Sequence, residues 1–153
     1  MSTAWRIVKK RHVESAFDGE GARHYGGRWN SPGTAVVYVA ESRALALLEV
    51  LAGIRSLRHS SAYVLIPVDF DEELTRALDP DQLPDAWDQG PPQPSVQRLG
   101  DEWVDQQESP ILKVPSVIVP GEYNYLLNPA HPDFRRIEIG APQELPIDPR
   151  LTT

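Results

Sequence analysis

Residues 35–53 read AVVYVAESRALALLEVLAG. The first six residues are β-branched, aromatic or small, which predicts a buried strand over 35–40. The residues that follow Ser42 are strong helix formers, and Ser42 is a preferred N-cap residue. Gly53 is typical of the residue that ends a helix. We therefore expect a strand that passes directly into a helix.

Other segments on both sides of this unit also predict short elements. Strands are expected at Tyr63–Phe70, with Pro67 restricting that end to a sheet edge or a bulge, at Ile111–Val119, interrupted by Pro115, and at Phe134–Ile139; a short helix is expected at Arg98–Gln107. The 15 prolines gather after residue 80 and favour irregular connections there. The sum is an α+β fold, with short mixed strands and a few helices.

Length and composition describe an ordinary globular chain. The 153 residues fit one domain, 1–153, and 41% of them are hydrophobic. We find no apolar run of the length that a membrane helix needs, and no signal-peptide pattern, so neither membrane nor secretion is expected. The chain has no cysteine, which favours the cytoplasm. The four histidines lack metal-ligand spacing, so no metal site is expected.

The charge is uneven along the chain. The net charge is −7, which argues against general nucleic-acid binding. Residues 1–60 hold nine basic and five acidic side chains, whereas residues 61–153 hold six and seventeen. The first part therefore suits an anionic ligand. The acidic run Asp69–Glu108 is either a solvated face or a surface for a basic partner protein.

The segment around Arg28 is the first candidate for chemistry. Gly26 and Gly27 allow a backbone to approach a ligand closely, and the Arg28 guanidinium suits a phosphate or a carboxylate. The alternative is a simple turn in which Trp29 packs on the core and Arg28 is solvated. The glycine spacing excludes a P-loop.

Glu49, Tyr38 and Ser116 are polar residues in apolar surroundings. The Glu49 carboxylate either lies on a narrow solvated stripe with Arg43 or points into a cleft where it has a partner. Tyr38 is either a core aromatic or a residue that shares the cleft with Arg28 and Glu49. Ser116 interrupts an apolar strand, where packing and a backbone hydrogen bond would account for it.

Six short blocks in order along the chain resemble the RES domain family, the toxin half of RES–Xre toxin–antitoxin pairs. The blocks are GGRWN at 26–30, VYVA at 37–40, ALLE at 46–49, LGDEW at 99–103, VPS at 114–116 and NYLLNPAHPD at 124–133. The family is named for an Arg, a Glu and a Ser, which fall here on Arg28, Glu49 and Ser116. Arg6 corresponds to a further arginine of the family pattern.

The resemblance implies a fold similar to the ADP-ribosyltransferase toxins and an enzyme that uses NAD+ as its substrate. It implies cleavage of the nicotinamide–ribose bond, with phosphate or water as acceptor, and growth arrest as the result. An alternative is ADP-ribosyl transfer to a cytoplasmic protein. The implied partner is an Xre-type helix-turn-helix antitoxin, bound in a hetero-oligomer. A non-catalytic module that binds its partner through the acidic run is a third hypothesis.

The resemblance also gives each site residue a role. Glu49 would bond the ribose hydroxyls and face the positive charge of the transition state. Tyr38 would stack on nicotinamide or hold its amide, and Ser116 would position the ribose or the amide. Arg28 and Arg6 would neutralise the pyrophosphate, and could also hold an incoming phosphate.

Overall fold

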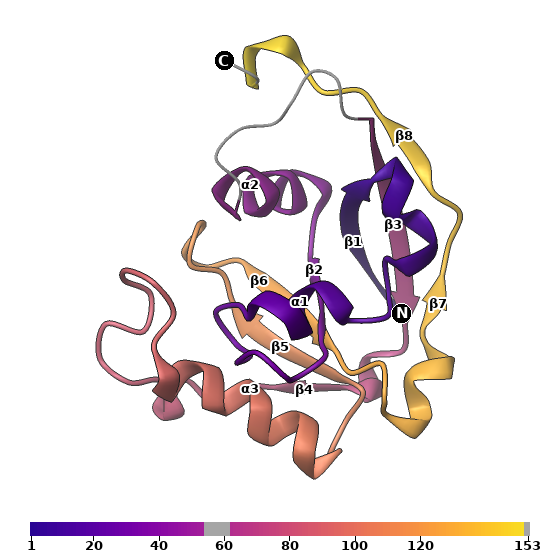
Figure 1. Ribbon diagram of the computed structural model, residues 1–153. Coiled ribbons are helices and arrows are strands. Elements are labelled where there is room, and N and C mark those ends of the chain that lie inside the picture. Colours follow the sequence, from indigo (N-terminus) through magenta and orange to yellow (C-terminus); the bar gives the residue numbers. More distant parts are fainter. Residues whose placement is uncertain (54–61, 152–153) are drawn as a thin grey trace.

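Eight strands form one curved sheet in the computed structural model, which describes residues 1–53 and 62–151 (Figure 1). The strand order is β4-β5-β6-β2-β1-β3-β7, and β8 also pairs with β3. The strands are β1 (Ser2–Lys9), β2 (Val37–Ala40), β3 (Tyr63–Phe70), β4 (Thr75–Ala77), β5 (Ile111–Pro115), β6 (Tyr123–Leu127), β7 (Glu138–Ile139) and β8 (Gln143–Leu145). All the pairs are antiparallel except β4 with β5.

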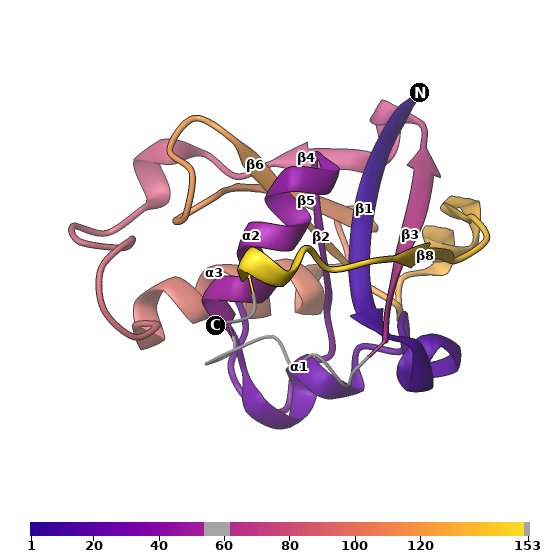
Figure 2. The same cartoon turned by 90° about the horizontal axis from the view of Figure 1, so that it is seen from above.

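Three α-helices pack around this sheet within the described residues (Figure 2). They are α1 (Glu20–Tyr25), α2 (Arg43–Gly53) and α3 (Pro94–Gln106). Short 3-10 helices are η1 (Lys10–Ser15), η2 (Glu72–Leu74), η3 (Pro80–Gln82), η4 (Pro132–Arg136) and η5 (Pro149–Leu151). Within these residues, no helix is both long and apolar enough to cross a bilayer. The combination of one mixed sheet and a few helices confirms the predicted α+β class.

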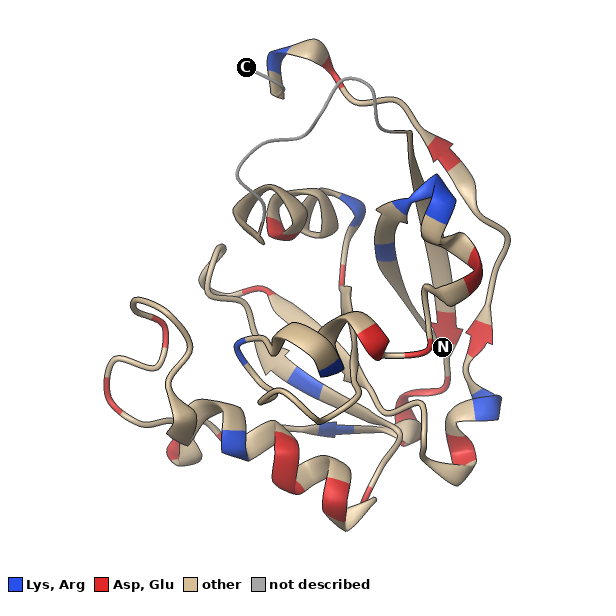
Figure 3. Cartoon of the chain, viewed as in Figure 1, with Lys and Arg blue, Asp and Glu red and all other residues tan. Residues whose placement is uncertain are grey.

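Charged side chains are distributed as the sequence asymmetry predicts. Figure 3 shows basic residues on β1 and η1 and acidic residues along α3. Glu102 and Asp105 of α3 are exposed. This acidic part of the chain is therefore at least in part a solvated face.

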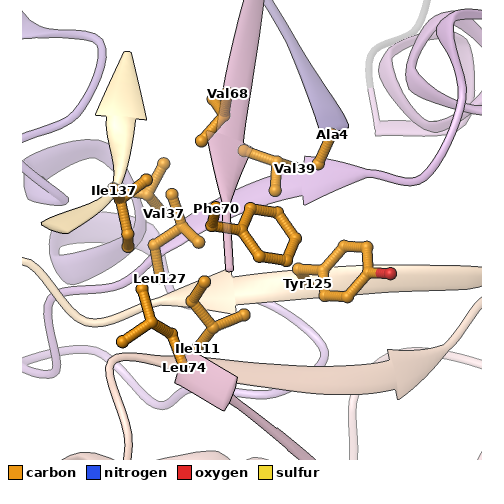
Figure 4. Close-up of a cluster of buried hydrophobic side chains, with 10 residues drawn as sticks. All are labelled: Ala4, Val37, Val39, Val68, Phe70, Leu74, Ile111, Tyr125, Leu127 and Ile137. Atoms are coloured by element: carbon orange, nitrogen blue, oxygen red, sulfur yellow. The ribbon is translucent and has the colours of Figure 1, made fainter. Parts of the chain in front are cut away.

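The main core lies on one face of the sheet, where β2, β3, β5 and β6 contribute alternate residues (Figure 4). Phe70 meets Tyr125 edge-on, with ring centroids 5.3 Å apart. The buried cluster consists of Ala4, Val37, Val39, Val68, Phe70, Leu74, Ile111, Tyr125, Leu127 and Ile137. Because side chains alternate between the faces of a strand, Tyr38 is left on the opposite face from Val37 and Val39.

The opposite face packs against α3 and the turn at residues 27–30. Trp29, Val96, Trp103 and Leu112 are among the buried residues of this second cluster. A Cβ atom added at Gly100 would lie only 1.7 Å from the Trp29 carbonyl oxygen. The glycine therefore allows α3 to approach this turn directly.

The predicted elements agree with the structure best where the apolar pattern is continuous. The helix that follows Ser42 and the strand over 63–70 are confirmed, whereas the strand at 35–40 begins at Val37 and the helix at 98–107 begins earlier, at Pro94. Pro67 lies where β3 passes from its pairing with β8 to its pairing with β7. β3 is therefore not an edge strand as a whole, because β1 pairs with one side of it and β7 and β8 with the other; the Pro67 carbonyl accepts a hydrogen bond from Gly140 N in the gap between β8 and β7.

Two predicted strands are wrong in extent. Residues 132–136 form η4 instead of a strand, because Pro132 fits the first helical position and the His131 Nδ1 atom accepts from Asp133 N. The strand predicted over 111–119 ends at Pro115. The Ser116 hydroxyl accepts from the N–H groups of Ile118 and Val119 and so turns the chain out of the sheet.

Candidate functional site

A cleft of about 700 Å³ opens between α2, β1, α1 and the loop that follows β5. This volume lies within the range of ligand-binding pockets. Four of the residues singled out in the sequence line it together: Arg6, Arg28, Tyr38 and Glu49. The strand-to-helix unit at residues 37–53 accounts for two of them, since β2 carries Tyr38 on the floor and α2 carries Glu49 on a wall.

The Glu49 carboxylate is held through one of its two oxygens. Ala46 and Val50 also line the cleft. Ala46 is three positions from Glu49 and four from Val50, and residues at these spacings share a face of a helix. Oε2 accepts hydrogen bonds from Ser116 Oγ at 2.9 Å and from Asn124 Nδ2 at 2.5 Å. Among the residues that the structure describes, none donates to Oε1. Glu49 therefore does not lie on a solvated stripe: it lines a cleft, where its carboxylate has hydrogen-bond partners.

Ser116 lies behind Glu49 and does not line the cleft. Its side chain is 3% exposed, and its hydroxyl donates to Glu49 while accepting from two backbone N–H groups of the following turn. Ser116 thus contacts a residue of the cleft, Glu49, without lining the cleft itself. The direct contact with a ribose or an amide stays a prediction.

Tyr38 has its hydroxyl occupied by the turn at residues 27–30. The hydroxyl donates to Asn30 Oδ1 at 2.5 Å and accepts from Trp29 N at 3.2 Å. A Cβ atom added at Gly27 would lie 2.6 Å from this hydroxyl, so any other residue there would have to displace the Tyr38 side chain or the turn. Burial raises the pKa of Tyr38, and the hydrogen bond from Trp29 only partly opposes the effect. Tyr38 therefore stays neutral at physiological pH. Because its hydroxyl is occupied, the ring is the part of the side chain that a ligand in the cleft can contact.

Arg28 holds a loop at the mouth of the cleft. Its guanidinium donates to the carbonyl oxygens of Trp87 at 3.2 Å and Gly90 at 3.0 Å. The Trp87 ring contacts Trp29, with ring centroids 5.7 Å apart, and Pro92 of the same loop lines the cleft. Arg28 is thus not the simple solvated residue of the alternative, although Gly26 and Gly27 do lead into a turn closed by the Gly27–Asn30 bridge.

Arg6 of β1 is hydrogen-bonded through its side chain to the segment before α1 and to β2. Its guanidinium donates to Ala16 O at 2.6 Å and to Tyr38 O at 3.0 Å. Burial lowers the pKa of Arg6 to about 10, and the nearby Asp18 opposes part of this shift. Arg6 therefore remains charged at neutral pH, and the cleft holds two cations.

Comparison with known proteins shows which family this chain belongs to. Residues 3–148 match the family described as RES domain, which is nearly the whole chain. The chain belongs to the RES domain family. The resemblance inferred from the six sequence blocks is confirmed.

Several relatives of this RES domain are named as toxins. The chain is 37% identical over 148 residues to Toxin Res of Yersinia enterocolitica, covering 96% of this chain and 97% of that one. It is 38% identical over 152 residues to the Prs ADP-ribosylating toxin of a Sphingobium species, covering 96% and 94%.

A solved structure shares the fold. It is the M. tuberculosis MbcT–MbcA toxin–antitoxin complex, of which one chain matches with a TM-score of 0.76 at 20% identity. The match covers 94% of this chain and 84% of that one. At this identity the likeness supports the fold of the RES domain.

The structure also adds polar residues that the sequence analysis did not single out. Asn124 bonds Glu49, and the buried Asn30 bonds Tyr38 and donates to the carbonyl oxygens of Ala22 and Thr34. Asp101 accepts from both the N–H and the hydroxyl of Ser31, which fixes the same turn. For Asn124 the available signal is a carboxamide within an apolar strand, where it needs a partner.

Metal-ligating side chains do not gather in the part of the chain that the structure describes. No group of three or more His, Cys, Asp or Glu residues could hold an ion there.

Proposed function

We propose that this RES-family toxin binds NAD+ in the cleft and cleaves the bond between nicotinamide and ribose. The observation that carries the proposal is the Glu49 carboxylate, which is held through Oε2 and lines a cleft with two arginines. A pocket of this size, with a few charged groups in mostly apolar walls, is typical of a small-molecule site.

Glu49 would stabilise the transition state of this cleavage. As nicotinamide leaves, the ribose ring gains positive charge at its anomeric carbon, and the bonding electrons go to the pyridine nitrogen. A carboxylate that bonds the ribose hydroxyls and faces this charge favours the transition state over the ground state. The half-buried position of Glu49 strengthens the interaction, since the effective dielectric constant is lower than in water.

Arg6 and Arg28 would bind the pyrophosphate, and Tyr38 would lie against the nicotinamide ring. Guanidinium groups match phosphate oxygens in pairs, and both arginines already present ordered forks of donors. Because the Tyr38 hydroxyl is occupied, we favour stacking of its ring over a hydrogen bond to the amide.

The acceptor of the ADP-ribosyl group defines two candidate activities. Phosphate or water would give degradation of NAD+, and Arg28, together with Arg6, could also hold the incoming phosphate. The second candidate is transfer to a cytoplasmic protein. The relative named Prs ADP-ribosylating toxin, at 38% identity, favours keeping this candidate.

We further propose that the chain acts in the cytoplasm and is inhibited there by an antitoxin. An enzyme that consumes NAD+ would harm its own cell unless a partner blocked it. The structural relative was solved as a toxin–antitoxin complex, which supports a partner of this general kind. We expect the partner to be an Xre-type helix-turn-helix protein in a hetero-oligomer with this chain.

Release of nicotinamide tests the proposed function. The purified chain is incubated with NAD+, with and without phosphate, and separately with labelled NAD+ in a lysate. Glu49→Gln should lower the rate by at least about 10²–10³-fold while the fold is kept. Glu14→Gln makes the same change at an exposed residue of η1 and should leave the rate unchanged. A folded chain that neither releases nicotinamide nor transfers label would refute the proposal.

A further inference from the structure

Asn124 lies in the middle of the sheet and reaches the cleft. Its strand, β6, runs between β5 and β2, and Asn124 is paired with Val114 on one side and Ala40 on the other. A residue with a strand on each side has little backbone freedom. The side chain is half-buried and lines the cleft beside Glu49.

The chemistry of the contact fixes how the carboxamide is oriented. An ionised carboxylate only accepts hydrogen bonds, so the Nδ2 group of Asn124 must face Glu49 Oε2, 2.5 Å away. Ser116 Oγ donates to the same oxygen at 2.9 Å. Both donors thus approach one oxygen, and the torsion of the Glu49 carboxylate is set by two separate segments, the turn that follows β5 and the strand β6.

We infer that Asn124 is a positioning residue for the proposed reaction: together with Ser116 it holds Glu49 Oε2, so that Oε1 is the oxygen presented to the ribose. This inference rests on the proposed function. A carboxylate without these donors could rotate and would present either oxygen over a range of angles. Catalysis by electrostatic stabilisation depends on groups that are already oriented, so the effect should appear mainly in kcat.

Asn124→Asp gives the sharpest test because it keeps the shape and changes only the donor. When the introduced carboxyl is protonated, it can donate to Glu49 as the amide does. When it is ionised, it repels Glu49 and donates nothing. We therefore expect nicotinamide release by this variant to approach the wild-type rate at about pH 5 and to fall at least about tenfold below it by about pH 8.

Gln143→Glu is the matched control. It makes the same change from amide to carboxylate at an exposed residue of β8 and should follow the wild-type pH profile. A profile of Asn124→Asp that runs parallel to the wild type would overturn the inference. Asn124→Ala adds no charge and should lower kcat about ten- to hundredfold with KM changed much less. A change confined to KM would also overturn it.

A second measurement separates this inference from the proposed function. Carboxyl groups are titrated by carbon NMR in Asn124→Asp and in the double variant Asn124→Asp with Glu49→Gln. The introduced carboxyl should have a raised pKa in the first protein and a pKa nearer the ordinary value in the second, because its partner charge is gone. Equal values would refute the contact even in a chain without activity. Coupled values together with an inactive wild type would refute only the proposed function.

Discussion

Ser116 donates a hydrogen bond to Glu49 across 2.9 Å while its oxygen accepts from the N–H groups of Ile118 and Val119, both at 3.1 Å. One hydroxyl thus ends a strand, orders a turn and orients a carboxylate. Stability and the geometry of the cleft depend on the same atom.

Ser116→Ala should therefore lower both stability and activity. The variant leaves two N–H groups and one carboxylate oxygen without this partner, and we expect a loss of about 1–3 kcal/mol in the free energy of unfolding. The rate of nicotinamide release should fall about tenfold or more. Urea unfolding and the release assay check the two effects. Ser95→Ala, at an exposed position of α3, is the control, and equal behaviour of the two variants would contradict the prediction.

Tyr38→Phe should change how stability depends on alkaline pH. Burial raises the pKa of Tyr38, so the folded state keeps a proton that the unfolded state loses above about pH 10. This contribution is fully present below about pH 10 and disappears as the pH rises beyond it. The variant should be less stable at neutral pH, because Asn30 Oδ1 and Trp29 N lose a partner, and should lose stability less steeply above about pH 10.

Urea unfolding at a series of pH values measures both effects. Tyr25→Phe is the control, because the Tyr25 side chain is 87% exposed. A slope for Tyr38→Phe that matches the wild type above about pH 10 would show that the hydroxyl is not buried as described.

Arg28→Lys should loosen the loop at the mouth of the cleft and weaken binding of the dinucleotide. A lysine ammonium cannot span the two carbonyl oxygens that the guanidinium fork reaches, at Trp87 and Gly90. We expect faster amide exchange in residues 86–93 and a KM for NAD+ raised about tenfold. Arg98→Lys, at an exposed position of α3, should change neither quantity. Unchanged exchange in the loop would contradict the role given to Arg28.

Gly100→Ala should destabilise the fold, although alanine is the better helix former. The added Cβ atom would lie 1.7 Å from Trp29 O, so α3 and the turn must separate. We expect a loss of at least about 2 kcal/mol in the free energy of unfolding. Gly21→Ala in α1 meets nothing within 4 Å and should be neutral, or stabilising by up to about 1 kcal/mol. Thermal unfolding of the two variants makes the comparison, and equal melting temperatures would count against the close approach.

The sequence predicts those elements whose local pattern and tertiary setting agree. The helix at 43–53 has a cap, a run of strong helix formers and a final glycine, and the strand at 63–70 has a continuous apolar run. β1 and β6 were not predicted, because tryptophan, arginine, asparagine and tyrosine interrupt their apolar pattern, and partner strands supply their pairing. The sequence at 134–139 has a strand-like composition, yet the proline before it and the His131 cap favour a 3-10 helix.

Four members of the site were predictable, whereas Asn124 and the contacts between residues were not. The resemblance to the RES family selected Arg6, Arg28, Tyr38 and Glu49, and the fold brings all four to one cleft. Pairing of β6 with β2 and β5 places Asn124 beside Glu49, 75 positions away in the chain. Composition and spacing carry no information about a contact of that range.

The two cleft arginines bond to main-chain carbonyl oxygens and, within residues 1–53 and 62–151, form no salt bridge. The carboxylates of Asp18 and Glu49 line the same cleft and balance this charge without a direct ion pair. Salt screens the attraction between these guanidinium groups and an anionic dinucleotide, so the affinity of the proposed substrate should decrease as the salt concentration rises. In a chain of net charge −7, the cleft would then attract anions locally while the rest of the surface repels them.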